Sequence, residues 1–175
     1  MAKVRRLAAV SVLIVLLGSA SFGVCAQSPD DAAIAKQFLG MWRLVARTNR
    51  FADGTTRLSV QNVAYIFYTD TNPMRMCYVG MDPNRPKWKS GFVPTESEAL
   101  SGINGSSSYC STVEVHAKEG LVVHHVEISS VPNLVGRDRK RWFTFDGPNR
   151  LTLRVDAAEL RPEFVGEALV WERVR

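Results

Sequence analysis

The chain has 175 residues, of which 46% are hydrophobic and 22% charged, and its formal net charge is +5. This length fits one domain and is long enough to bury a substantial core. Nucleic-acid-binding proteins usually concentrate positive charge on one face, whereas the basic run at residues 137–141 is short and contains an acid. We interpret this run as a solvated turn, and the composition argues against a nucleic-acid partner.

Residues 1–26 are predicted to be a signal peptide. Three basic residues lie among the first six, an apolar stretch follows over 7–17, and a small-x-small pattern ends at Ala26. The apolar stretch is too short for a membrane-spanning helix, which needs roughly 20 residues. We therefore expect cleavage after Ala26 and a periplasmic or secreted mature chain without a stable membrane span. A lipid anchor on Cys25 is the alternative, which the bulky Val24 disfavours.

Cleavage also changes the charge and the cysteine count. Lys and Arg fall from 22 to 19 against 17 acids, so the mature net charge is about +2. Cys77 and Cys110 remain, and in an oxidising compartment one disulfide is the natural interpretation. It would close a loop of about 33 residues and stabilise the fold by roughly 3–4 kcal/mol. Two buried free thiols are the alternative.

The mature chain begins with an extension over residues 27–37, and helix-forming alanines predict a helix over 30–38. A barrel domain is expected over 38–175, where the pattern is almost entirely that of strands. Runs rich in β-branched and aromatic residues alternate with turn signals such as Asp53-Gly54. Evenly spaced short strands of this kind indicate an antiparallel sandwich or barrel. The predicted strands cover 41–47, 60–69, 74–80, 107–116, 121–129, 140–146, 151–155 and 169–174.

A long insert over residues 81–102 interrupts the rhythm of the strands. Its first half is predicted to be loop, with an exposed Trp88. Its second half carries a capping-box pattern from Thr95 to Glu98, which would open a short helix ending at Leu100. A loop this long is often a lid or a binding loop, and a plain surface insertion fits equally well.

Alternation along residues 121–129 predicts which way two adjacent histidines point. Because burying an unpaired Glu127 is costly, the even-numbered residues should face the core, so His124 points inward and His125 outward. The preceding strand agrees, since its odd-numbered positions are apolar or small. A two-residue loop at 119–120 would pair Val115 with His124, and Tyr109 with Ser130.

The same reasoning orients the neighbouring strands. Arg141 shares a face with Phe143 and Phe145, and a buried guanidinium there would bind an anion or a carbonyl; the opposite face of that strand stays an alternative. On the strand over 74–80, the face predicted to point inward carries Met74, Met76 and Tyr78. Both mature cysteines then lie on outward faces, which is consistent with a disulfide on the outer surface.

Several motifs in order make the chain resemble the bacterial and fungal lipocalin-like domain family, over residues 38–175. They include Gly40-x-Trp42, Tyr68-Thr69, Tyr109, His124-His125-Val126-Glu127, Pro132-Asn133, Arg141 and Trp171-Glu172-Arg173. The resemblance implies an all-β fold, an antiparallel barrel of about eight or more strands. The residue patterns above add a short N-terminal helix and a short helix in the long insert. The resemblance also implies a structural pairing of Trp42 and Arg173 at one barrel end. Ser111 and Val113 depart from the Gly and Tyr that the family tends to have.

The barrel is expected to bind a small hydrophobic molecule in a mostly apolar interior. The candidate ligand-binding residues are Tyr78, Tyr109, His124, Arg141 and Met76. A filled core acting as an interaction module is one alternative. An isomerase or cyclase is another, since a histidine beside a tyrosine can do acid–base chemistry, but no catalytic residue is assigned.

No cofactor is predicted, and no metal. Glu114, His116 and His125 would share the outer face, but their spacing matches no recognised metal motif.

Overall fold

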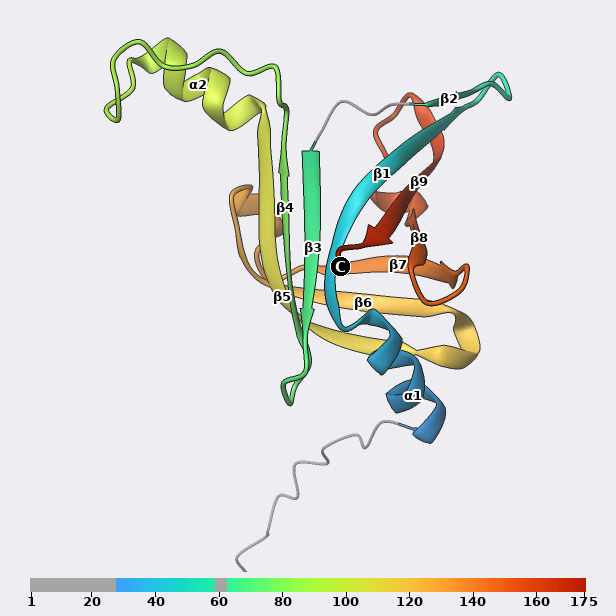
Figure 1. Cartoon of the computed structure of the whole chain (residues 1–175). Helices are drawn as coiled ribbons and strands as arrows, with labels where there is room; N and C mark the ends of the chain where they lie inside the picture. The colour runs from blue at the N-terminus through green and yellow to red at the C-terminus, as the bar shows by residue number, and fades with distance from the viewer. Residues whose placement is uncertain (1–27, 59–62) are drawn as a thin grey trace, which may run out of the picture.

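The computed structural model describes residues 28–58 and 63–175 (Figure 1), so the predicted signal peptide lies outside the described residues. Within these ranges there are two α-helices, nine β-strands and three 3₁₀ turns. In chain order they are α1 (Pro29–Phe38), β1 (Gly40–Phe51), β2 (Thr56–Leu58), β3 (Val63–Thr69), β4 (Arg75–Met81), α2 (Glu96–Asn104), β5 (Ser106–His116), η1 (Ala117–Glu119), β6 (Leu121–Ser129), η2 (Pro132–Leu134), β7 (Asp138–Phe145), β8 (Arg150–Val155), η3 (Ala157–Glu159) and β9 (Phe164–Arg173).

The strands form one antiparallel sheet that closes into a barrel, as predicted. The order is β2-β1-β3-β4-β5-β6-β7-β8-β9, and β1 also pairs with β9. Closure therefore uses eight strands, β1 and β3–β9, while β2 is an extra strand on the far part of β1. The long β1 serves three neighbours because it pairs with β3 near its start, with β2 near its end and with β9 along its length.

The barrel interior follows from alternation along each strand. In β3, exposed residues alternate with the buried Ala64, Ile66 and Tyr68. In β6, His124 is fully buried and His125 is partly exposed, so the predicted orientation is confirmed. Ile128 was expected to point inward but is 63% exposed. A register shift between Cys110 and Ser111 reverses the alternation at that point.

The predicted register between β5 and β6 is wrong by two residues near the turn and by one residue beyond the register shift at Cys110 and Ser111. The connection is the 3₁₀ turn η1 followed by Gly120, whose φ of +62° is left-handed, and not a two-residue loop. His124 therefore pairs with Val113 instead of Val115, and Tyr109 lies opposite Ser129 instead of Ser130. Because a slip of two residues keeps every side chain on its face, the residues between the turn and the register shift keep their predicted faces, and only Ile128 beyond it is reversed.

Strand boundaries differ from the prediction mainly near the open end of the barrel. The short β2 was not expected, and β9 begins five residues before the predicted strand. Strand β7 begins at Asp138, so the basic run at 137–141 is not a solvated turn. Cross-strand pairing orders it, and Arg141 is buried. The start of the strand expected over 60–69 lies outside the described residues.

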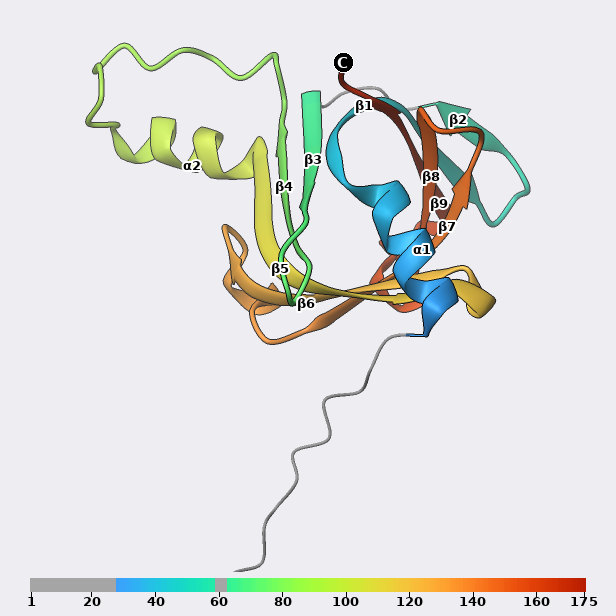
Figure 2. The ribbon, with the colours of Figure 1, turned by 60° about the horizontal axis from the view of Figure 1, so that its bottom comes forward.

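Helix α1 lies across one end of the barrel (Figure 2). Ser28 caps it in a reciprocal capping box with Asp31, and an acid in the first turn suits the helix dipole. The backbone N–H of Ala117 in η1 donates to the other oxygen of Asp31 at 2.7 Å. This hydrogen bond is the largest cause of a lowered pKa of Asp31. It also fixes the helix against the β5–β6 connection.

Aromatic packing fills the barrel beneath α1. The ring of Phe38 lies 5.1 Å from Phe143 and 4.9 Å from Phe145. The indole N–H of Trp42 donates to the Phe38 carbonyl at 2.7 Å. The Arg173 guanidinium lies 4.1 Å above the Trp42 ring and donates to the carbonyls of the α1–β1 junction. This end of the barrel is therefore closed.

The insert between β4 and β5 stands away from the barrel at the end opposite α1 (Figures 1 and 2). Helix α2 opens at Thr95 with the predicted capping box but continues to Asn104 instead of ending at Leu100. Trp88 is exposed, as predicted, and its indole N–H donates to the Glu98 carbonyl at 3.1 Å. Donors from Ser90, Thr95 and the Lys89 backbone lower the pKa of Glu98 to about 2. In the described part of the chain, neither helix has the length and hydrophobicity needed to cross a bilayer.

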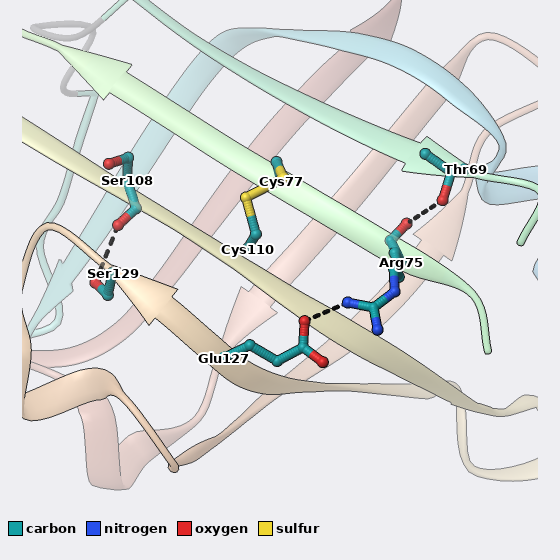
Figure 3. Close-up of a disulfide and its surroundings, with 7 residues drawn as sticks. All are labelled: Thr69, Arg75, Cys77, Ser108, Cys110, Glu127 and Ser129. Carbon is teal, nitrogen blue, oxygen red and sulfur yellow. Dashed lines mark hydrogen bonds and ion pairs between the residues drawn. A yellow bond between two sulfur atoms is a disulfide. The ribbon is translucent and has the colours of Figure 1, made fainter. Parts of the chain in front are cut away.

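Cys77 and Cys110 form a disulfide on the outer surface of the barrel (Figure 3). The two residues are direct cross-strand partners in β4 and β5. The parity argument placed both on outward faces, and the structure agrees. Arg75 of β4 and Glu127 of β6 form an ion pair close by, across the intervening β5.

Candidate functional site

A cavity of about 590 Å³ occupies the half of the barrel that lies away from α1. Its rim includes residues 104–107 at the base of the insert and Arg161 of the β8–β9 connection. His124 and Trp171 contribute to its floor. The sequence left open whether the barrel is hollow or filled. It is packed at the α1 end and hollow at the other.

His124 is held between two tyrosines at the floor of the cavity. Its Nδ1 lies 3.0 Å from the Tyr109 hydroxyl and its Nε2 lies 3.1 Å from the Tyr68 hydroxyl. Burial, reinforced by the charges of Arg141 and Arg139, places the pKa of His124 well below its usual value. The ring is therefore neutral: one nitrogen donates to a tyrosine oxygen and the other accepts from a tyrosine hydroxyl.

Sequence reasoning did not assign Tyr68 to the site. Its position in the Tyr68-Thr69 motif and the alternation of β3 were the signals that it faces the interior. Burial raises the pKa of Tyr68 well above that of a free phenol, so it stays protonated. Tyr68, His124 and Tyr109 thus form one hydrogen-bonded chain across the barrel.

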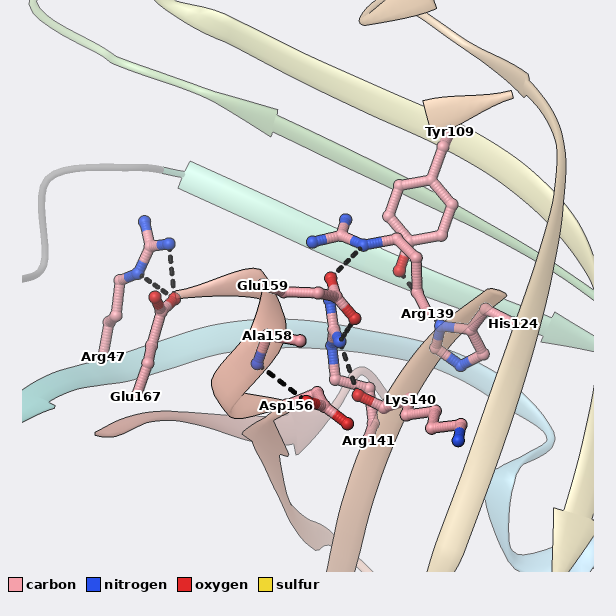
Figure 4. Close-up of polar contacts among 10 residues, drawn as sticks. All are labelled: Arg47, Tyr109, His124, Arg139, Lys140, Arg141, Asp156, Ala158, Glu159 and Glu167. Carbon is pink, nitrogen blue, oxygen red and sulfur yellow. Dashed lines mark hydrogen bonds and ion pairs between the residues drawn. The ribbon is translucent and has the colours of Figure 1, made fainter. Parts of the chain in front are cut away.

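Two arginines of β7 share one carboxylate at the cavity wall (Figure 4). Arg141 donates to both oxygens of Glu159, at 2.7 and 3.0 Å, and Arg139 donates to one of them at 2.7 Å. Burial alone would lower the pKa of Arg141, but the hydrogen bonds and charge of Glu159 outweigh it and raise that pKa. Burial likewise opposes the ionised form of Glu159, and the hydrogen bond and charge of Arg141 prevail and lower its pKa.

A second ion pair lies on another part of the wall, where β1 meets β9. The Nε of Arg47 donates to Glu167 at 2.7 Å, and Figure 4 shows this pair apart from the Glu159 cluster. Tyr78 also lines the cavity, and its side chain lies over Gly80, where an added Cβ would be 2.1 Å from the hydroxyl. Burial raises the pKa of Tyr78, and the charge of Arg47 partly opposes this.

Among the residues that the structure describes, two that line the cavity carry buried polar atoms without a hydrogen-bond partner. They are the Nε1 of Trp171, a residue that is 1% exposed, and the Oδ1 of Asn49. An unmade hydrogen bond at a buried group costs about 1–3 kcal/mol, and such groups in native structures call for an explanation. Ser111 has a similar unpartnered hydroxyl in the barrel interior.

Four of the five residues proposed to bind ligand line the cavity: Tyr78, Tyr109, His124 and Arg141. Met76 does not. It is buried one layer nearer the closed end, where it pairs with Tyr68 and Ser111. The expectation of a mostly apolar interior is also wrong. The lining contains four arginines and three acids, namely Arg47, Arg139, Arg141, Arg161, Asp82, Glu159 and Glu167.

The two histidines on the outer face, His116 and His125, lie at ion-pair distances from acidic side chains. His125 lies 2.6 Å from Asp138 and 3.4 Å from Glu114, and His116 lies 3.4 Å from Glu114. Among the described residues, no group of three or more His, Cys, Asp or Glu side chains is arranged to hold a metal ion. The histidine that bears on the site is therefore His124.

A comparison with protein-family sequence models agrees with this architecture. The sequence model of the lipocalin-like domain family matches residues 39–174, which include every strand of the barrel. A comparison with curated proteins gives no significant match. Among solved structures, a redesigned β-barrel aligns over 81% of this chain and 95% of its own, with 12% identity and a TM-score of 0.42. The chain belongs to the lipocalin-like domain family, and its barrel fold is one that supports small-molecule binding.

Proposed function

We propose that this protein is an exported binding protein that holds a small molecule in the open half of its barrel. The observation that carries the proposal is the cavity of about 590 Å³, which is within the range of ligand pockets.

The polar lining narrows the expected ligand from a hydrophobic molecule to an amphipathic one. Leu153, Leu169 and Phe164 provide an apolar wall along β8 and β9. The arginine–glutamate clusters provide the polar wall. A purely apolar ligand would separate these charged groups from water without replacing the hydrogen bonds that water gives them. A molecule with an apolar body and polar substituents fits both walls.

Export is part of the proposal and rests on two features of the chain. The first is the predicted signal peptide over residues 1–26. The second is the Cys77–Cys110 disulfide, because such bonds persist mainly in oxidising compartments. Mass spectrometry of the mature protein should find the chain beginning at Gln27. A chain that keeps residues 1–26 in its native host would contradict export.

The binding role is favoured over the enzyme alternative because of how His124 is held. Both of its ring nitrogens are engaged by tyrosine hydroxyls, at 3.0 and 3.1 Å. The ring therefore has no free lone pair with which to remove a proton from a bound molecule. We assign His124 a positioning role, in which it fixes the Tyr109 hydroxyl at the cavity wall.

Native mass spectrometry of the protein purified from its host compartment tests the binding function. We expect a co-purifying small molecule in the wild type and its loss in Ser107→Trp, where the new side chain enters the cavity. The matched control is Ser108→Trp, the next residue on the same strand, which lies outside the cavity lining and should retain the molecule. Absence of any bound mass in wild type and control alike would reject the proposal.

A further inference from the structure

The cavity wall contains a carboxylate that the protein itself supplies on a surface turn. Glu159 is the last residue of η3, in the connection between β8 and β9. Its carboxylate accepts three hydrogen bonds from Arg141 and Arg139, at 2.7 to 3.0 Å. The arrangement is a bidentate guanidinium–carboxylate pair with a second guanidinium added, which is how proteins recognise organic acids.

The buried guanidinium of Arg141 needs an anionic partner, which either Glu159 or a bound ligand could supply. The residue is 4% exposed, and a buried guanidinium without a partner is strongly unfavourable. Glu159 fills the need in the structure. Any other carboxylate in the same place would satisfy Arg141 equally, so exchanging one for the other costs the guanidinium little.

The turn that carries Glu159 lies outside the strand pairings of β8 and β9, so displacing it breaks no pair of the sheet. Its backbone hydrogen bonds are local: Ala158 and Glu159 donate to Asp156, and Leu160 donates to Ala157. Ala157, Ala158 and Arg161 are exposed. The other buried acid of the cavity, Glu167, lies within β9 and is paired in register with Asn49, so it has no such freedom.

The charges of the lining point to an anionic ligand. Four arginines face three acids, and His124 is neutral. In the described part of the chain, Arg161 makes no ion pair although it lies on the same connection as Glu159. A ligand with one negative charge would make the lining electrically neutral if Glu159 stayed at the rim beside Arg161.

We propose that the cavity binds an organic monocarboxylate whose carboxylate displaces Glu159 from Arg141 and Arg139. This inference rests on the proposed binding function. The apolar body of the ligand lies against Leu153 and Leu169, and the displaced Glu159 swings outward with its turn. Glu159 is thus an internal competitor that keeps Arg141 satisfied when the cavity is empty.

An internal competitor of this kind makes the apparent affinity for a ligand proportional to the fraction of protein molecules in which the site is free. If the Glu159 turn is open about one-tenth of the time or less, removing its carboxylate raises the affinity for carboxylates about tenfold or more. The affinity for a neutral molecule of the same shape does not rise, because it gains nothing from a free guanidinium pair.

The test uses 2-naphthoate and 2-naphthamide, which have the same ring system and differ in charge. Each is titrated calorimetrically into the disulfide-bonded wild type, Glu159→Gln and Glu163→Gln. Glu163 is the matched control because it is an exposed acid on the same connection. We expect wild type and Glu163→Gln to bind alike, and Glu159→Gln to bind 2-naphthoate about tenfold tighter or more without a comparable gain for 2-naphthamide.

A folded Glu159→Gln that binds 2-naphthamide like the wild type, with no gain for 2-naphthoate, overturns this inference and leaves the binding function intact. If neither compound binds to any folded variant, the result counts against both this inference and the proposed binding function. Because the variant leaves Arg141 unpaired and its folding can suffer, hydrogen exchange on the wild type gives a second measurement. Saturating 2-naphthoate should speed exchange at residues 158–160, whereas 2-naphthamide should not. Unchanged or slower exchange with 2-naphthoate overturns the displacement.

Discussion

Acidification should destabilise the wild-type protein more than a His124→Gln variant, and the burial of the imidazole gives the sign of the difference. Burial, with the charges of Arg141 and Arg139, keeps the pKa of His124 in the folded protein well below its ordinary value of 6.5. In the unfolded chain the same imidazole returns to that ordinary value. Below pH 6.5 the unfolded state therefore binds one more proton than the folded state.

The sign and the magnitude follow from linkage. The free energy of unfolding falls by up to about 1.4 kcal/mol for each pH unit below 6.5, as long as the folded protein keeps the ring neutral. From pH 7.5 to 4.5 the loss due to His124 is at most about 3 kcal/mol, the limit in which the folded protein keeps the ring neutral throughout. Above pH 7.5 the ring is neutral in both states and contributes no pH dependence.

Urea denaturation of both proteins at one-unit steps from pH 7.5 to 4.5 measures this difference. Carboxylates with lowered pKa values, such as Asp31 and Glu159, also lose stabilisation on acidification, but they are present in both proteins and cancel. Glutamine is a suitable replacement because its amide can both donate to and accept from the two tyrosines. Parallel pH profiles for the two proteins would refute the reasoning, since they would mean that folding does not keep His124 neutral.

Three further predictions concern the scaffold. Reducing the disulfide should lower the free energy of unfolding by about 3–4 kcal/mol. Urea denaturation with and without reductant measures this, and a mass shift after alkylation verifies the reduction; overlapping curves would show that the bond does not stabilise the fold. Trp42→Phe should cost about 1–2 kcal/mol more than Trp171→Phe in the same assay, because only the first indole N–H makes a hydrogen bond; equal losses would contradict this. Gly80→Ala should push Tyr78 into the cavity and weaken 2-naphthamide binding about fivefold, or about 1 kcal/mol. In the control Gly102→Ala, the added Cβ contacts only Trp88 of the insert. An equal loss of 2-naphthamide binding in this control would contradict a role for the Tyr78 displacement.

The sequence predicted the fold well because alternation and turn signals are local properties. His124 and Arg141 were correctly placed in the interior from the parity of single strands. The family motifs, read in order, indicated the barrel. The disulfide followed from two outward positions on strands that turned out to be neighbours.

The polar side of the cavity escaped prediction for physical reasons. In β1 the buried Trp42 and Leu44 imply that even-numbered residues face inward, but a register shift between Leu44 and Ala46 reverses the alternation. Arg47 and Asn49 therefore reach the cavity. Irregularities of this kind depend on pairing between strands and have no clear local signature.

Glu159 was missed for a different reason. It lies in a connection and not in a strand, so no periodicity applied to it. Its partner Arg141 was identified, and a buried guanidinium implies an acid somewhere. Which acid supplies the charge depends on the path of the β8–β9 connection, which strand patterns leave undefined.

The disulfide on the outer surface of the barrel also constrains side chains on the inner surface. A strand that slips by one residue against its neighbour turns its side chains to the opposite face, and a covalent bond between direct partners in β4 and β5 forbids such a slip. The next pair in the same register is Tyr78 with Tyr109, whose rings lie 5.5 Å apart in the cavity wall. The disulfide on the outer surface therefore adds a covalent constraint on the relative placement of these two phenols in the cavity wall.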